Sequence, residues 1–260
     1  MEKYNKIGHN YNQTRKPDPQ LTENLYQHLQ PQTSGVYLDI GCGTGNYTIA
    51  LHQQKNVQFI GVEPSTKMLE IAKSKCNTID WRYGTAEKIP LEDASVAGIM
   101  GTLTVHHWQD MGKAFAELYR VLKPKGKLVI FTSTPEQMKG YWLNHYFPMM
   151  LEKSMQPMPA FEVFEKHLTE NGFQNIRTDK YFIQADLQDL FLYSGKFDPN
   201  LYLQPHVRKG ISSFADLANQ AEVEKGLAVL QADILSGDWQ KLKEKYENEE
   251  GDYLYVITEK

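Results

Sequence analysis

A glycine-dense stretch between a buried strand and a helix places the strongest constraint on this chain. Residues 36–40 form a short apolar run, which predicts a buried strand. Gly41, Gly43 and Gly45 then alternate with other residues, and a helical pattern opens at Tyr47. A strand, a glycine turn and a helix in this order are typical of a cofactor loop at the carboxyl edge of a parallel sheet. Glycines turn the chain sharply there and let backbone N–H groups approach a ligand.

The spacing of these glycines, and the residue before them, narrow the choice of ligand. Dinucleotide-binding loops follow the pattern G-x-G-x-x-G, but here the third glycine is Gly45 and Asn46 follows it. Asp39, two positions before the first glycine, adds a carboxylate that would repel a pyrophosphate. This carboxylate suits a ligand with positive charge near the loop, and S-adenosylmethionine (SAM) has such charge on its amino group and its sulfonium.

The composition indicates a globular protein of the cytoplasm. Its 260 residues, 41% of them apolar, allow one large domain or a domain with a sizeable insertion. The formal net charge of -4 gives no basic surface for nucleic acid. No apolar run approaches the roughly 18 residues of a membrane helix, and the N-terminal residues are not those of a secretory signal. The two cysteines, Cys42 and Cys76, imply no disulfide framework. We therefore expect a cytoplasmic localisation, with neither nucleic acid nor a membrane as partner.

A second buried strand ends in a carboxylate. Residues 57–62 are mostly apolar, and Glu63 closes the run. Nucleotide-binding folds place their ribose ligand at about this distance along the chain. Taken alone, Glu63 would be interpreted as a residue that caps or solvates a strand end. With Asp39 and the glycine loop upstream, we predict that it binds ribose hydroxyls. Ser65 is predicted to cap the helix that follows.

The rest of the first half continues the alternation of strands and helices. Three further short segments are predicted to be strands, at 80–83, 93–100 and 127–132. Asp110 is predicted to cap a helix over 111–122, which a turn at 123–126 ends. Loops after central strands carry the chemistry in open α/β sheets. Residues 101–108, which follow the fourth strand, are therefore the predicted catalytic stretch.

Two motifs in this region resemble one known family. Residues 39–45, Asp-Ile-Gly-Cys-Gly-Thr-Gly, closely match the first motif of class I SAM-dependent methyltransferases, and residues 118–128 are also similar to that family. The resemblance is nearest to the type-11 group, of the ubiquinone/menaquinone-biosynthesis type, whose acceptors vary widely. It covers residues 36–132 well and the remainder in outline. It implies an α/β fold with a Rossmann-like, doubly wound sheet of seven strands, mostly parallel with the last strand antiparallel, and a helical lid.

The resemblance also implies a division of the chain. The family ends with an antiparallel hairpin, whose strands we expect near 175–183 and 253–257, so the residues between them would form an insertion. The expected parts are a cofactor-covering arm and helix (1–30), a SAM-binding core (31–134), a lid segment with a helix and a sheet strand (135–184), a helical lid insertion (185–248) and the closing strand of the core (249–260).

The family's cofactor contacts carry over to particular residues. In the family, a Tyr followed four residues later by an Arg before a Pro commonly borders the methionine end of SAM. Tyr11 and Arg15 resemble that arrangement, and the alternative is an arm on the surface. An acidic residue that bonds adenine in the family is replaced by Thr85, and backbone groups of Ala86 can serve instead. The expected cofactor-binding residues are Tyr11, Arg15, Asp39, Gly41, Cys42, Gly43, Glu63, Pro64, Met68, Thr85, Ala86, Glu87 and Leu103.

Methyl transfer from a sulfonium needs few catalytic groups. The protein mainly aligns the acceptor and excludes water, and a base is needed only when the acceptor holds a proton of high pKa. His106 and His107 are the candidate catalytic residues, because unperturbed His has a pKa of about 6.5. In an extended backbone one would face the substrate while the other packs; alternatively, both are structural. Adjacent histidines without nearby carboxylates or thiols make a poor metal site, so no metal is expected.

The identity of the acceptor stays open at this point. No Asn-Pro-Pro-Tyr follows the fourth strand, which argues against DNA amino groups and glutamine as acceptors. Aromatic residues of the lid suit a small, partly apolar acceptor, or simply form the lid's own core. We predict SAM-dependent methyl transfer to a small molecule by a monomer or homodimer. The alternatives are a non-catalytic SAM-binding module, an NAD-dependent oxidoreductase and a methyltransferase that acts on macromolecules.

Overall fold

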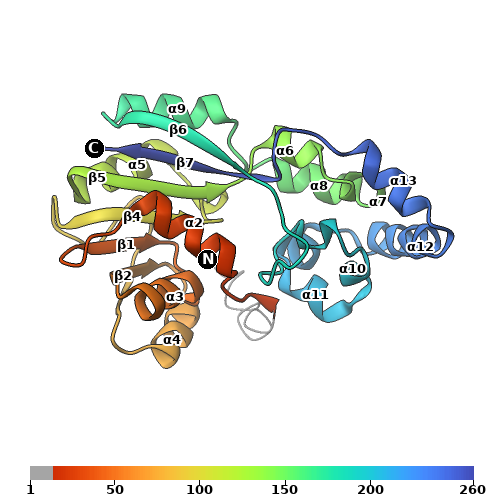
Figure 1. Ribbon diagram of the computed structural model, residues 1–260, viewed down its shortest axis with the longest axis horizontal. Helices are drawn as coiled ribbons and strands as arrows, with labels where there is room; N and C mark the ends of the chain where they lie inside the picture. The colour runs from red at the N-terminus through yellow and green to blue at the C-terminus, as the bar shows by residue number, and fades with distance from the viewer. Residues whose placement is uncertain (1–13) are drawn as a thin grey trace.

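The computed structural model describes residues 14–260, and a single mixed sheet organises them (Figure 1). Its seven strands follow the order β3-β2-β1-β4-β5-β7-β6. The parallel strands are β1 (Val36–Ile40), β2 (Gln58–Glu63), β3 (Asp80–Tyr83), β4 (Val96–Thr102) and β5 (Leu122–Thr132). β7 (Tyr253–Glu259) is antiparallel to both β5 and β6 (Gln174–Tyr181). The predicted seven-strand, mostly parallel sheet with an antiparallel last strand is therefore confirmed.

Helices cover both faces of the sheet. Alternate residues of each strand belong to two separate core clusters, as the period of a strand requires; Tyr37 lies in one cluster and Leu38 in the other. The first cluster includes residues of α2 (Pro19–Leu29), α3 (Asn46–Lys55) and α4 (Thr66–Lys75). The second includes residues of α5 (Met111–Val121) and α9 (Phe161–Glu170). The predicted caps are present, because Ser65 Oγ accepts from Met68 N and Asp110 Oδ1 accepts from Lys113 N.

Several strand ends differ from the prediction by a residue or more, and two of them need an explanation. β4 continues through Thr102, so the loop begins two residues later than expected. β5 begins at Leu122 and includes the Pro and Gly that predicted a turn. The register explains this, since Val96 pairs with Leu122 while Gly98 pairs with Lys127. The turn residues form a bulge inside the strand, which sequence-local signals could not distinguish from a loop.

Two segments form a helical lid to one side of the sheet (Figure 1). The first follows β5 and contains α6 (Pro135–Lys139), α7 (Leu143–Tyr146) and α8 (Pro148–Met155). The second lies between β6 and β7 and contains η2 (Ser194–Lys196), α10 (Asn200–Leu203), α11 (Pro205–Gly210), the π-helical turn η3 (Ser213–Leu217), α12 (Gln220–Ser236) and α13 (Asp238–Lys245). Within residues 14–260, no helix combines the length and the apolar character that a membrane span requires.

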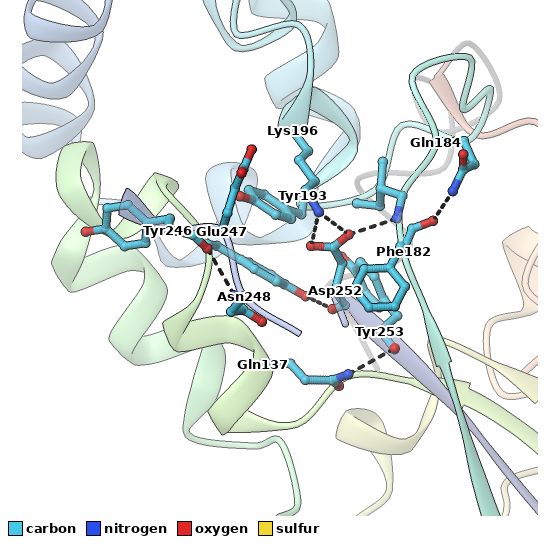
Figure 2. Close-up of polar contacts among 12 residues, drawn as sticks. Gln137, Phe182, Gln184, Tyr193, Lys196, Tyr246, Glu247, Asn248, Asp252 and Tyr253 are labelled. Atoms are coloured by element: carbon cyan, nitrogen blue, oxygen red, sulfur yellow. Dashed lines mark hydrogen bonds and ion pairs between the residues drawn. The ribbon is translucent and has the colours of Figure 1, made fainter. Parts of the chain in front are cut away.

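A largely buried ion pair ties the second lid segment to the sheet (Figure 2). Lys196 Nζ lies 2.9 and 2.7 Å from the two carboxylate oxygens of Asp252, just before β7. Ile183 N, just after β6, donates to the same carboxylate at 2.8 Å, and Tyr141 OH donates to the Asp252 carbonyl. Asp252 therefore links the chain before β7 to the chain after β6 and to both lid segments.

Candidate active site

A cavity of about 650 Å³ lies between the carboxyl ends of the central strands and the lid. From the sheet side it is lined by the glycine loop, by Glu63 at the tip of β2 and by residues that follow β4. From the lid side it is lined mainly by apolar side chains, including Met138, Met158, Phe191, Ile211 and Leu217. A second cavity of about 50 Å³ shares Arg15, Gly41, Gly43 and Thr102 with the first. The two together form one site with a sheet half and a lid half.

The predicted site residues that the structure describes all line one of these cavities. Asp39 and Cys42 line the small one, while Arg15, Gly41 and Gly43 line both. The large cavity is lined by the others, namely Glu63, Pro64, Met68, Thr85, Ala86, Glu87, Leu103, His106 and His107. Tyr11 lies outside the described residues.

The three glycines of the loop have left-handed backbones for different reasons. Their φ angles are 68°, 54° and 76° for Gly41, Gly43 and Gly45. A Cβ on Gly41 would lie 2.0 Å from Thr104 Oγ1, and one on Gly45 would lie 2.4 Å from the Trp81 ring. A Cβ on Gly43 would meet only Met68 Sδ, at 3.8 Å. Gly41 and Gly45 thus permit close packing of the loop, whereas Gly43 presents open backbone to the cavity.

Glu63 is held rigidly beside this loop. Its Oε2 accepts from Gly43 N at 3.1 Å, and its Oε1 accepts from Ser65 N at 2.9 Å. Burial raises the pKa of this carboxyl, and the two backbone donors oppose the rise. A carboxylate has about four acceptor positions. Glu63 therefore retains acceptor capacity for a pair of hydroxyls in the cavity.

Asp39 is buried next to the loop with one oxygen left unsatisfied. Thr48 Oγ1 donates to its Oδ2 at 2.5 Å, while its Oδ1 has no hydrogen-bond partner among the described residues. Burial, and to a lesser degree the charge of Glu63, raise its pKa to about 7 against the opposing bond from Thr48. Because an unpaired buried carboxylate is costly, a cationic ligand group in the small cavity would stabilise it.

Both histidines line the large cavity, whereas the sequence predicted only one. They lie on η1 (Val105–His107), a 3-10 helix, with ring centroids 3.9 Å apart. The prediction assumed an extended backbone, but in a 3-10 helix neighbours are only about a third of a turn apart. Burial, His107 and Arg15 hold the pKa of His106 well below its usual value. His106 is therefore a neutral imidazole at pH 7, and its buried Nδ1 has no hydrogen-bond partner within residues 14–260.

Known proteins share this fold. A family model described as a methyltransferase domain matches residues 38–130. The crystal structure of a putative methyltransferase from an antibiotic biosynthesis pathway of Anabaena variabilis superposes with a TM-score of 0.85, at 35% identity over 95% of this chain and 99% of that one. A demethylmenaquinone methyltransferase of Oceanobacillus iheyensis is 30% identical over 176 residues, which cover 65% of this chain and 72% of the relative. The chain belongs to the class I SAM-dependent methyltransferases of the type-11 family. SAM is the cofactor of this family.

Other curated relatives match the methyltransferase over a smaller share of their length. An uncharacterized methyltransferase of Schizosaccharomyces pombe is 36% identical over 64% of this chain and 66% of its own. One of Mycobacterium tuberculosis is 33% identical over 44% of this chain and 46% of its own. The chain thus spans less than two thirds of each of these two relatives.

The residues of the methyltransferase fit SAM at several points. The unsatisfied Asp39 Oδ1 suits a cation, Gly43 leaves room for a ligand against the backbone, and Glu63 can accept hydroxyls. Paired backbone bonds between Thr85 and Lys88 shape a tight turn after β3. The Glu87 carboxylate, which was expected at the cofactor, accepts from Gln109 N at 2.7 Å and from Asp110 N at 3.3 Å. Glu87 therefore also fastens this turn to the loop after β4.

Sequence reasoning missed two residues at or next to the methyltransferase site. Lys75 Nζ donates to Thr44 Oγ1 at 3.0 Å and to Asn46 Oδ1 at 2.8 Å, which braces the glycine loop. Burial lowers the pKa of Lys75 to about 8. Asp189, from the lid insertion, lines the small cavity beside Arg15. Neither residue stands in a recognisable motif, so only their contacts reveal them.

Proposed function

We propose that this methyltransferase transfers the methyl group of SAM to a small-molecule acceptor held under the lid. The observation that carries the proposal is the cavity of about 650 Å³, which joins the glycine loop to an apolar lid surface. Small-molecule sites span about 300–1,000 Å³. The cavity therefore has the size for a cofactor and a modest acceptor.

Particular residues of the site would hold and orient the ligands. Asp39 and Arg15 stand at the small cavity, where the amino-acid end of SAM would lie, and Glu63 would accept the ribose hydroxyls. When bound, SAM supplies an activated methyl group. The lid residues exclude water and fix the acceptor, and alignment of this kind accounts for most of the catalysis expected in such a reaction.

The two histidines offer limited acid–base chemistry. Neutral His106 can accept a proton or a hydrogen bond at Nδ1 from an acceptor in the cavity. Its lowered pKa makes it a weak base, which suits an acceptor that ionises readily better than an alcohol. His107 also lines the cavity and is exposed.

Turnover with labelled SAM tests the proposal. The protein is incubated with SAM that carries a deuterated methyl group and a panel of small acidic phenols, enolisable carbonyls and amines, and mass spectrometry detects labelled product and S-adenosylhomocysteine. We expect a labelled product with at least one class and none with a Gly43→Val control, in which the cofactor cannot approach the loop. Tight SAM binding without turnover on the panel would favour the non-catalytic module, and tight NADH binding without SAM binding would establish the oxidoreductase.

A further inference from the structure

The lid insertion places a buried carboxylate on an arginine at the cofactor loop. The side chain of Asp189 is 2% exposed. Its Oδ1 accepts from Arg15 Nε at 2.5 Å, and its Oδ2 accepts from Arg15 Nη2 at 3.1 Å and from Tyr47 OH at 3.0 Å. Tyr47 lies on the first turn of α3, directly after the glycine loop. A bidentate pair of this kind fixes the plane of the guanidinium as well as its position.

Two backbone N–H groups of the same lid segment donate to the chain on both sides of Arg15, one to a backbone carbonyl and one to a side-chain carboxylate. Leu190 N donates to Thr14 O at 3.0 Å, and Gln188 N donates to Asp18 Oδ2 at 3.0 Å. Arg15 O in turn accepts from Asn46 Nδ2 at 2.9 Å, which joins it to the glycine loop. Residues 188–190 therefore clamp residues 14–18 against the loop.

The clamp connects the two halves of the site. Asp189 and Arg15 both line the small cavity beside Asp39, while Phe191 and Leu192, only two and three residues further along, line the large cavity on its lid side. Because only one residue separates Asp189 from Phe191, the lid side of the large cavity and the Asp189–Arg15 contact cannot move independently. A lid displaced from the sheet would leave Arg15 without its bidentate partner.

We propose that Asp189 is a positioning residue, which holds Arg15 at the amino-acid end of SAM and thereby makes cofactor affinity depend on the lid. The inference rests on the proposed function, because it takes the small cavity as the site of the cofactor's methionine portion. Asp189 acts through Arg15, whose guanidinium would bind the methionine carboxylate. Holding the fork in advance saves the entropy of ordering a long side chain on binding.

Two ligands that differ in the amino-acid end test the proposal. S-adenosylhomocysteine has the amino-acid portion and 5′-methylthioadenosine lacks it, while both carry the adenosine. Asp189→Asn should weaken the binding of S-adenosylhomocysteine by about tenfold or more, as expected for lost charged hydrogen bonds. The same substitution should change the affinity for 5′-methylthioadenosine by less than about twofold. Asp186→Asn is the matched control, since Asp186 is exposed in the same segment. Calorimetry on the full chain gives both affinities.

A second variant separates positioning from damage to the fold. If Asp189 acts through Arg15, the double variant Arg15→Gln/Asp189→Asn should bind S-adenosylhomocysteine no more weakly than Arg15→Gln alone, and Asp189→Glu should recover part of the affinity. Equal losses for both ligands, or additive losses in the double variant, would overturn the proposal. If the wild-type protein bound neither ligand, the result would instead contradict the proposed function itself.

Discussion

Asp39 and Glu63 stand at the ends of neighbouring strands beside the glycine loop, and each has acceptor capacity directed at the site. Asp39→Ala and Glu63→Ala should each weaken the binding free energy of SAM by roughly 1.5–3 kcal/mol, the usual cost of losing hydrogen bonds to a charged group. Calorimetry measures the affinities, with Glu70→Ala on the exposed surface of α4 as control. Unchanged affinity in both variants would contradict the cofactor assignment.

Asp39 should also make the stability of the ligand-free protein depend on pH. Its pKa is raised from 3.8 to about 7 in the folded protein, mainly by burial. Between these values the folded state holds a proton that the unfolded state has released, so this group's contribution falls as pH rises. Asp39→Asn lacks this effect. Its unfolding free energy in urea, relative to that of wild type, should therefore rise as the pH is raised from about 5 to about 8. An identical difference at both pH values would refute this.

The two histidines differ in surroundings and should differ in effect. His106 is partly buried with an unsatisfied Nδ1, whereas His107 is exposed. Once an acceptor is known, His106→Gln should lower kcat by about tenfold to a hundredfold, and His107→Gln by less. This loss lies at or below the low end of the roughly hundredfold to ten-thousandfold typical of an acid–base group, because His106 is a weak base. Steady-state kinetics with saturating SAM separates kcat from KM. Equal and small losses would mean that both residues are structural.

At the scale of elements, the loop between β1 and α3 allows fold and ligand effects to be separated. Gly41→Ala and Gly45→Ala would drive a Cβ into Thr104 or Trp81, so both should lower the melting temperature strongly. Gly43→Ala should cost only the roughly 1–2 kcal/mol of stability that its positive φ implies, because its Cβ would meet only Met68 Sδ, at 3.8 Å. Thermal unfolding of the three variants checks the ranking. A Gly43 variant as unstable as the other two would be inconsistent with this geometry.

Local patterns predicted the elements whose causes are local. The caps Ser65 and Asp110 act within their own first turns, and the apolar runs at 36–40 and 57–62 lie largely buried in central strands. The start of β5 was not predictable in this way, because the pairing of Leu122 with Val96 decides it.

The candidate site was predictable to the same extent. Asp39, Glu63 and the glycines lie within one strand–loop–helix unit and the strand next to it, and a family motif carries most of them. The partner of Arg15 comes from position 189, far along the chain, and only the tertiary fold brings the two together. Both histidine side chains line the cavity because the loop forms a 3-10 turn, which the sequence of the loop did not predict.

At the scale of the whole molecule, the proposed function assigns the donor half of the site to the sheet and the acceptor half to the lid. Two charged contacts join the halves at different places, Arg15 with Asp189 at the cavity and Lys196 with Asp252 at the base of the lid. Both pairs have side chains at most 17% exposed. Breaking a largely buried ion pair leaves a charge without its partner in a poorly solvated place, which is costly. The orientation of the lid should therefore depend on these two contacts more than on surface ion pairs.

The pair at the base of the lid should therefore matter for stability. Asp252→Ala removes the carboxylate that accepts from Lys196 Nζ and from Ile183 N, and leaves the largely buried ammonium without a counter-charge. The variant should lose about 3–5 kcal/mol of unfolding free energy, measured with denaturant. The double variant Lys196→Met/Asp252→Ala should recover part of that loss, since no buried charge remains unpaired. Glu250→Ala is the matched control, because its contact with Lys180 is exposed and should contribute at most about 1 kcal/mol. If Asp252→Ala cost no more than this control, the base of the lid would be held by its apolar packing alone.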